Sequence, residues 1–104
     1  MTVSQFQAFV VSVDPDAGHY LSAFRGGYAY TEWREIRTLP LMGDGKHLGA
    51  MRFQIDRFTK DENDAVAAAL YQALESRDDI AFEYIVDAET ETEYIHHIFD
   101  CEAV

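Results

Sequence analysis

The clearest periodic pattern in the chain lies between residues 48 and 58. Apolar and polar side chains alternate there, in the order Met51, Arg52, Phe53, Gln54, Ile55 and Asp56. Successive side chains of a β-strand point to opposite faces, so a period of two is typical of a strand with one buried face. We therefore predict a half-buried strand over residues 48–58.

A helical period follows directly. Apolar residues recur three and four positions apart, at Val66, Ala69, Leu70, Ala73 and Leu74. This spacing places them on one face of a helix. Thr59 and Glu62 have the spacing of a capping box, in which both side chains accept backbone N–H groups at the start of a helix. The pattern predicts a helix over about residues 61–77.

The N-terminal segment is rich in β-branched and aromatic residues, which favour strands. We predict a strand over residues 3–13. Residues 14–18 read Asp-Pro-Asp-Ala-Gly, a turn sequence in which proline fixes φ and glycine permits positive φ. Residues 19–24 are then expected to return as the second strand of a hairpin.

The next segment has two interpretations. Residues 28–31 resemble a strand, whereas residues 32–37 fit either a short helix or a continuation of that strand. Residues 40–47 contain Gly43 and Gly45 and are predicted to form a loop.

The last 27 residues are expected to form a β-hairpin. Apolar residues alternate with other types from Ile80 to Val86, and a second strand is expected over residues 92–100. Pairing Asp87 with Thr92 would place Glu83 opposite His96. The loop at residues 88–91 has no glycine, so a wide turn is expected rather than a tight one.

These elements predict one domain over residues 1–104. At 48% hydrophobic residues the chain is too apolar for intrinsic disorder and is long enough for one core. The expected fold class is α+β: an antiparallel sheet of about five strands, with one main helix (about 61–77) packed on one face and a C-terminal β-hairpin.

Charge changes this picture because it is unevenly distributed. The formal net charge is −11, and residues 78–104 contain no Lys or Arg. Their acidic residues are Asp78, Asp79, Glu83, Asp87, Glu89, Glu91, Glu93, Asp100 and Glu102. Since apolar residues anchor the same segment in the core, these carboxylates are expected to have fixed positions. We interpret the nine as a candidate partner-binding surface.

The same charge excludes some partners. Phosphates would be repelled, and no cluster of Lys and Arg is available, so direct binding to nucleic acid or to anionic membranes is not expected. The N-terminus does not read as a signal peptide, and no apolar run approaches the roughly 18 residues of a membrane-spanning helix. With a single cysteine, Cys101, the expected location is cytoplasmic.

Candidate chemistry is sparse. His96, His97, Asp100 and Cys101 are the densest metal-capable group, but neighbouring histidines on a strand point to opposite faces and cannot easily share an ion. We predict no metal and no cofactor. Negative charge around His96 and His97 is expected to raise both pKa values. Acidic neighbours should also raise the thiol pKa of Cys101, which disfavours a catalytic role, so the protein is predicted to be non-enzymatic.

One aromatic group remains open between core and interface. It comprises Tyr20, Phe24, Tyr28, Tyr30 and Trp33. Rings of this kind fill cores and are also enriched at interface hot spots.

Three functions fit these features. The first is a small acidic inhibitor, of the phage-encoded anti-defence or immunity type, that occludes a basic surface of a protein partner. Where that surface otherwise holds nucleic acid, the inhibitor would act as a DNA mimic. The second is a structural subunit of a larger assembly, such as a phage tail or ring component, which would form homo-oligomers. The third is a small-molecule-binding domain with a pocket near His19 or His47.

Overall fold

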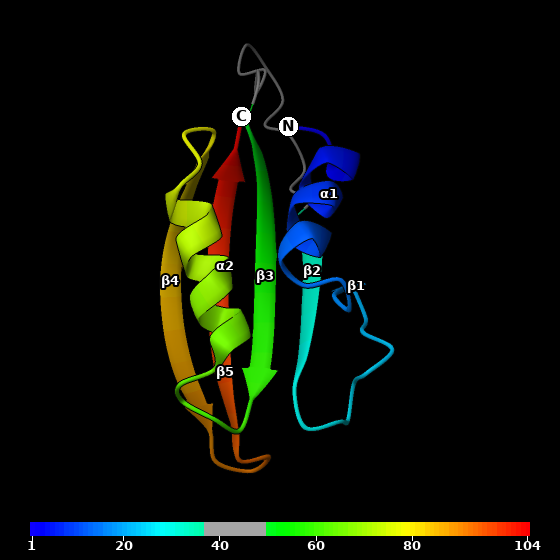
Figure 1. The fold of residues 1–104 in the computed structure, drawn as a ribbon, viewed down its shortest axis with the longest axis vertical. Helices are drawn as coiled ribbons and strands as arrows, with labels where there is room; N and C mark the ends of the chain where they lie inside the picture. Colours follow the sequence, from blue (N-terminus) through cyan, green and yellow to red (C-terminus); the bar gives the residue numbers. More distant parts are fainter. Residues whose placement is uncertain (37–49) are drawn as a thin grey trace, which may run out of the picture.

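A computed structural model describes residues 1–36 and 50–104 (Figure 1). Its elements are α1 (Val3–Val13), β1 (Gly18–His19), β2 (Tyr30–Ile36), β3 (Met51–Thr59), α2 (Ala65–Glu75), β4 (Ile80–Glu89) and β5 (Tyr94–Ala103). The five strands form one sheet in the order β1-β2-β3-β5-β4. The β1–β2 pair is parallel and the other pairs are antiparallel. The α+β class is thus confirmed, but the sheet is mixed and carries two helices instead of one.

Residues 3–13 form a helix, so the predicted N-terminal strand is wrong. Thr2 and Gln5 make a capping box: Gln5 N–H donates to Thr2 Oγ1 at 3.1 Å, and Thr2 N–H donates to Gln5 Oε1 at 2.8 Å. Phe6, Phe9 and Val10 are buried at helical spacing. Burial of this stripe outweighs the modest strand preference of the β-branched residues.

The turn at residues 14–18 is confirmed, but the predicted hairpin around it is not. Asp14 ends α1, and its carboxylate accepts the N–H of Asp16 at 3.1 Å. Only Gly18–His19 continues as a strand, and it pairs with β2 rather than with residues 3–13. A Cβ on Gly18 would lie 2.2 Å from the carbonyl oxygen of Leu21, so the close backbone approach requires glycine.

β2 and β3 form the centre of the sheet with β5. Residues 32–36 continue the strand. Of the two interpretations of this segment, the continued strand is therefore correct and the short helix is wrong. β3 confirms the predicted half-buried strand where the two overlap. The predicted loop at residues 40–47 lies outside the described residues.

α2 confirms the predicted main helix over a shorter range, Ala65–Glu75 instead of about 61–77. It is capped by Asp64, whose carboxylate accepts the N–H of Ala67 at 2.9 Å. The predicted capping box at residues 59–62 is wrong because Thr59 still belongs to β3. Its hydroxyl accepts the Asp61 N–H in the turn between strand and helix at 3.0 Å.

The C-terminal hairpin forms, but its predicted register is shifted. Glu89 pairs with Tyr94, and Glu83 faces Asp100 rather than His96. The difference from the predicted pairing is four residues. Since side chains alternate with a period of two, an even shift leaves every residue on its predicted face.

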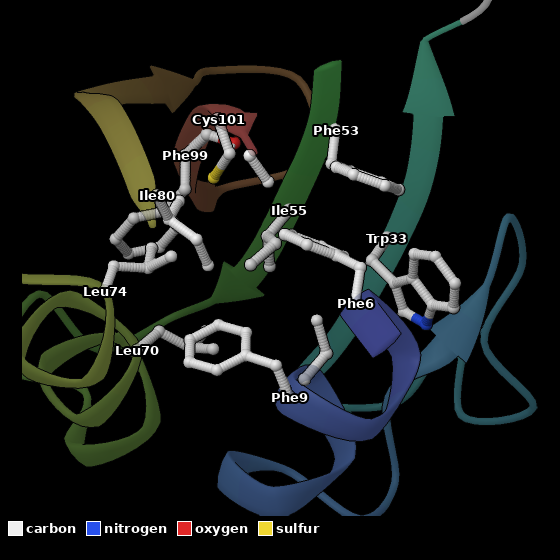
Figure 2. Packing of buried hydrophobic residues seen from close by; sticks show 12 residues of the cluster. Phe6, Phe9, Trp33, Phe53, Ile55, Leu70, Leu74, Ile80, Phe99 and Cys101 are labelled. Carbon is white, nitrogen blue, oxygen red and sulfur yellow. Dashed lines mark hydrogen bonds between the residues drawn. The ribbon is translucent and has the colours of Figure 1, made fainter. Parts of the chain in front are cut away.

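Both helices cover the same face of the sheet (Figure 1). In Figure 2, side chains from both helices meet those of the central strands in one hydrophobic core. Phe6 of α1 stacks on Phe53 of β3 with ring centroids 4.0 Å apart, and Leu70 and Leu74 of α2 are fully buried in the same cluster as Phe99. Neither of the two described helices covers the opposite face, which we call the outward face.

Candidate partner-binding surface

Strand alternation places five of the nine predicted carboxylates on the outward face. Because Phe99 and Cys101 are in the core, the residues between and beside them point away from the helices. The outward carboxylates of β4 and β5 are Glu83, Asp87, Glu89, Asp100 and Glu102.

Two of these carboxylates face each other directly. Glu83 is the cross-strand partner of Asp100, and Glu102 lies one pair further along. Like charges opposite each other destabilise an antiparallel pair. Arg52 of β3 offsets part of this repulsion, with Nη2 3.1 Å from Asp100 Oδ2. These four residues line a shallow hollow of about 320 Å³ that also contains Ala81 and Phe82.

The other four carboxylates lie at the two ends of the hairpin. Glu91 and Glu93 are exposed in the loop between β4 and β5, whereas Asp78 and Asp79 lie just before β4. The ten residues of β4 separate the two ends by roughly 30 Å, given the rise of a strand. The nine predicted residues therefore do not form one patch.

Three of the nine already have partners. Arg77 donates two hydrogen bonds of 2.8 Å to Asp79 and lowers the pKa of that carboxyl. Arg52 pairs with Asp100, and Glu89 lies 3.8 Å from Nδ1 of His96. Within residues 1–36 and 50–104, the remaining six make no ion pair. They are Asp78, Glu83, Asp87, Glu91, Glu93 and Glu102, and all are exposed.

His96 belongs to the outward face, but its partner is not Glu83. Its Nε2 lies 2.7 Å from Oδ1 of Asp56, and the same oxygen accepts a hydrogen bond of 2.8 Å from Gln54. The imidazole stacks on Phe58 with centroids 4.2 Å apart. This pair joins β5 to β3 across the face and places one more carboxylate, Asp56, on it.

β4 is an edge of the sheet. Among the described residues it pairs only with β5, so alternate N–H and C=O groups along its other side have no strand to bond. Its middle is also unusually apolar for an exposed strand. Tyr84, Ile85 and Val86 are 36%, 46% and 52% exposed. A long exposed edge of this kind is a pairing site for another chain.

A pocket of about 520 Å³ lies beside this edge, between α2 and the hairpin. Tyr71 of α2 and Tyr84 of β4 form one wall, with ring centroids 5.4 Å apart. Small side chains of α2, including Ala67, also line the pocket, and Glu62 and Asp64 add carboxylates. The pocket thus combines aromatic and acidic groups.

His97 lines the same pocket and is only 3% exposed. Its Nδ1 lies 2.7 Å from the hydroxyl of Tyr84, and its buried Nε2 has no hydrogen-bond partner within the described chain. Burial lowers the pKa of His97 and outweighs the opposing effect of Asp64, so the predicted raised pKa is wrong for this residue.

Cys101 is fully buried in the hydrophobic core. Burial raises the pKa of its thiol to about 12, and Asp100 adds to the effect. A thiol in this state is a poor nucleophile. The predicted rise in the thiol pKa is confirmed, but burial rather than the acidic neighbours is its main cause. In the described ranges, no three His, Cys, Asp or Glu residues are grouped so that they could hold a metal ion.

The aromatic group of the N-terminal half divides between core and surface. Trp33 and Tyr30 are buried, whereas Tyr20, Phe24 and Tyr28 are exposed. Sequence reasoning did not single out Tyr71, Tyr84 and His97 as neighbours. The alternating pattern of the hairpin did place Tyr84 and His97 on the same face, so their proximity could have been predicted. No pattern in the sequence indicated that Tyr71 of α2 would contact them.

No protein-family model matches the chain, and neither does any curated protein sequence. Within the described residues, neither helix has the length and apolar character needed to cross a membrane.

Proposed function

We propose that this protein is a non-enzymatic acidic binding protein that occupies a basic surface of another protein through the outward face of β4 and β5. The observation that supports it best is Glu83 facing Asp100, with Glu102 beside them. Such a placement destabilises the free protein. A Lys or Arg side chain from a partner would relieve this repulsion between the carboxylates. The energy that the repulsion costs the free protein would then be recovered on binding and would increase the affinity.

Occupying a basic surface provides a route to inhibition. If that surface otherwise holds nucleic acid, bound carboxylates at fixed strand spacing would take the place of phosphates. An inhibitor of the anti-defence or immunity type would act in this way. The charge would also speed association, since complementary fields raise encounter rates.

A pulldown from the source cells with the tagged protein tests the proposal. We expect capture of a strongly basic protein, identified by mass spectrometry, and its release as salt rises from 0.05 to 0.5 M, because salt screens exposed charges. Neutralising the outward face with Glu83→Gln, Asp87→Gln and Glu102→Gln should abolish capture.

The matched control removes the same number of charges elsewhere. Asp16→Asn, Asp61→Asn and Glu75→Gln all alter exposed positions off the outward face. Retained capture by this control, together with loss in the outward-face variant, supports the proposal. Equal capture by both variants would overturn it, and equal loss would show that net charge alone is responsible.

A further inference from the structure

We infer that the partner supplies an extended basic segment, which adds to β4 as a sixth strand and places a lysine side chain in the pocket beside Tyr71 and Tyr84. This inference rests on the proposed function and specifies how the basic partner is held. It names a mode of binding, β-strand addition, and a pocket that selects one side chain.

The backbone of β4 provides the first argument. The strand is ten residues long, lies at the sheet edge and pairs on one side only within the described chain. Water satisfies these backbone groups in the free protein, and an incoming strand would replace that water with a ladder of main-chain hydrogen bonds. Apolar side chains at Ile85 and Val86 would lose exposed area at the same time.

The charge of β4 decides between a second copy and a basic segment. In an antiparallel pair of two copies centred on Ile85, Glu83 of each copy would face Asp87 of the other. Like charges directly opposite each other oppose that pairing. A segment with Lys or Arg at the same positions would instead form two cross-strand ion pairs. The edge is thus protected against self-association and open to a basic strand.

The pocket specifies one side chain of that segment. A strand added to β4 would lie about 4.8 Å away, with alternate side chains on the same face as Tyr84. There a side chain meets the rings of Tyr71 and Tyr84 and the carboxylate of Glu62. Aromatic rings together with a carboxylate bind an ammonium group, and the apolar stem of lysine can pack along the rings.

His97 adds an independent observation at the same place. It is buried, lines the pocket, and has an Nε2 atom without a partner in the described chain. A buried polar atom without a partner is unfavourable unless a ligand satisfies it. When Nδ1 donates to the Tyr84 hydroxyl oxygen, the Nε2 lone pair is an acceptor for an ammonium N–H.

Three synthetic peptides test the inference by NMR titration of the ¹⁵N-labelled full chain at low salt. The first is an eight-residue valine peptide with lysine at positions 2, 5 and 6. In an antiparallel pairing with β4, the lysines at positions 2 and 6 face Asp87 and Glu83, and the lysine at position 5 lies on the face of Tyr84 and the pocket. The second has the same sequence with alternate backbone amides N-methylated, which removes strand pairing but keeps the charge. The third replaces each lysine with glutamate. Amide hydrogen exchange of residues 80–89 is measured with each peptide.

We expect the lysine peptide to bind, to slow exchange of the unpaired β4 amides at least tenfold, and to bind at least tenfold more tightly than the N-methylated peptide. The glutamate peptide should not bind. Equal binding of the two basic peptides without protection of β4 would overturn strand addition while leaving the acidic-surface proposal intact. Failure of both basic peptides would count against both proposals.

Variants separate the pocket from the edge. Tyr71→Leu keeps an apolar side chain on α2 but removes the ring, and should weaken the lysine peptide about threefold to tenfold. The control Tyr28→Leu removes an exposed ring far from the pocket in sequence and should change nothing. Equal affinities in both variants would overturn the lysine pocket. A dimer by light scattering whose β4 amides are protected without peptide would overturn the choice of a basic partner over a second copy.

Discussion

Arg57 holds the carboxylate of Asp64 at two points: Nε lies 2.9 Å from Oδ2, and Nη2 lies 3.2 Å from Oδ1. This pair joins β3 to the N-cap of α2. The same guanidinium donates to Thr31 of β2 at 3.2 Å and lies 3.7 Å from Asp14 at the end of α1. Burial alone would raise the pKa of Asp64, but the Arg57 hydrogen bonds prevail and lower it. One buried side chain thus connects four elements.

Arg57→Ala is expected to destabilise the protein by about 3–5 kcal/mol. The substitution leaves Asp64 and Asp14 buried without the cation that pairs with them. Urea unfolding followed by circular dichroism measures the effect. The matched control is Arg52→Ala, which breaks an exposed pair with Asp100 on the same strand and should cost less than about 1 kcal/mol. Similar losses in both variants would contradict the role given to Arg57.

Glu83→Lys is expected to raise stability while it weakens partner binding. The new cation would face Asp100, so a repulsive cross-strand pair becomes an attractive one, worth about 0.2–1 kcal/mol. The urea midpoint and the pulldown measure the two effects. Glu75→Lys, on the exposed side of α2, makes the same charge change away from the hairpin. A lower midpoint for Glu83→Lys than for this control would show that the two carboxylates do not repel each other.

Glu35 is expected to make the free energy of unfolding sensitive to acid. The Tyr20 hydroxyl and His19 Nε2 both contact its buried carboxylate, and the Tyr20 hydrogen bond is the main cause that lowers the pKa of Glu35 from 4.5 to about 2. A depressed carboxyl pKa stabilises the fold above pH 4.5, and this contribution, at most about 3 kcal/mol, is lost as pH falls toward 2. Unfolding free energy measured from pH 5 to 2 shows the loss.

Two variants test whether Glu35 is the residue responsible for this dependence of stability on pH. Glu35→Gln should remove it, and Tyr20→Phe should reduce it because the main stabilising hydrogen bond is missing. An unchanged slope in Glu35→Gln would assign the acid sensitivity to other carboxyl groups.

His97 is expected to titrate below the ordinary histidine pKa of 6.5, because burial disfavours the imidazolium. The unfolded chain binds a proton more readily at this residue, so stability falls as pH drops below about 6.5. NMR of the ¹⁵N-labelled imidazole measures the pKa. A pKa above 6.5 would show that the acidic surroundings prevail over burial.

Tyr84→Phe should destabilise the protein by about 1–2 kcal/mol, since it leaves Nδ1 of His97 without its hydrogen-bond partner.

Local patterns predicted what depends on neighbours in sequence. The alternation from Met51 to Asp56 identified β3, and the helical stripe with Leu70 and Leu74 identified α2. The faces of the C-terminal hairpin were also predictable, because a period of two survives an even error in register. Residues 3–13 were misassigned because β-branched residues suggested a strand, although Thr2 and Gln5 had the spacing of a helix cap.

The sequence alone thus determined that the C-terminal segment is an acidic hairpin without Lys or Arg. It also determined that the apolar residues on one face of this hairpin hold the carboxylates in place. Only the tertiary structure decided that β4 is the open edge, that Glu83 faces Asp100, and that Tyr71, Tyr84 and His97 share a pocket. Strand order and register depend on contacts between residues far apart in the chain. No local pattern encodes such contacts, because they form only when the whole core packs.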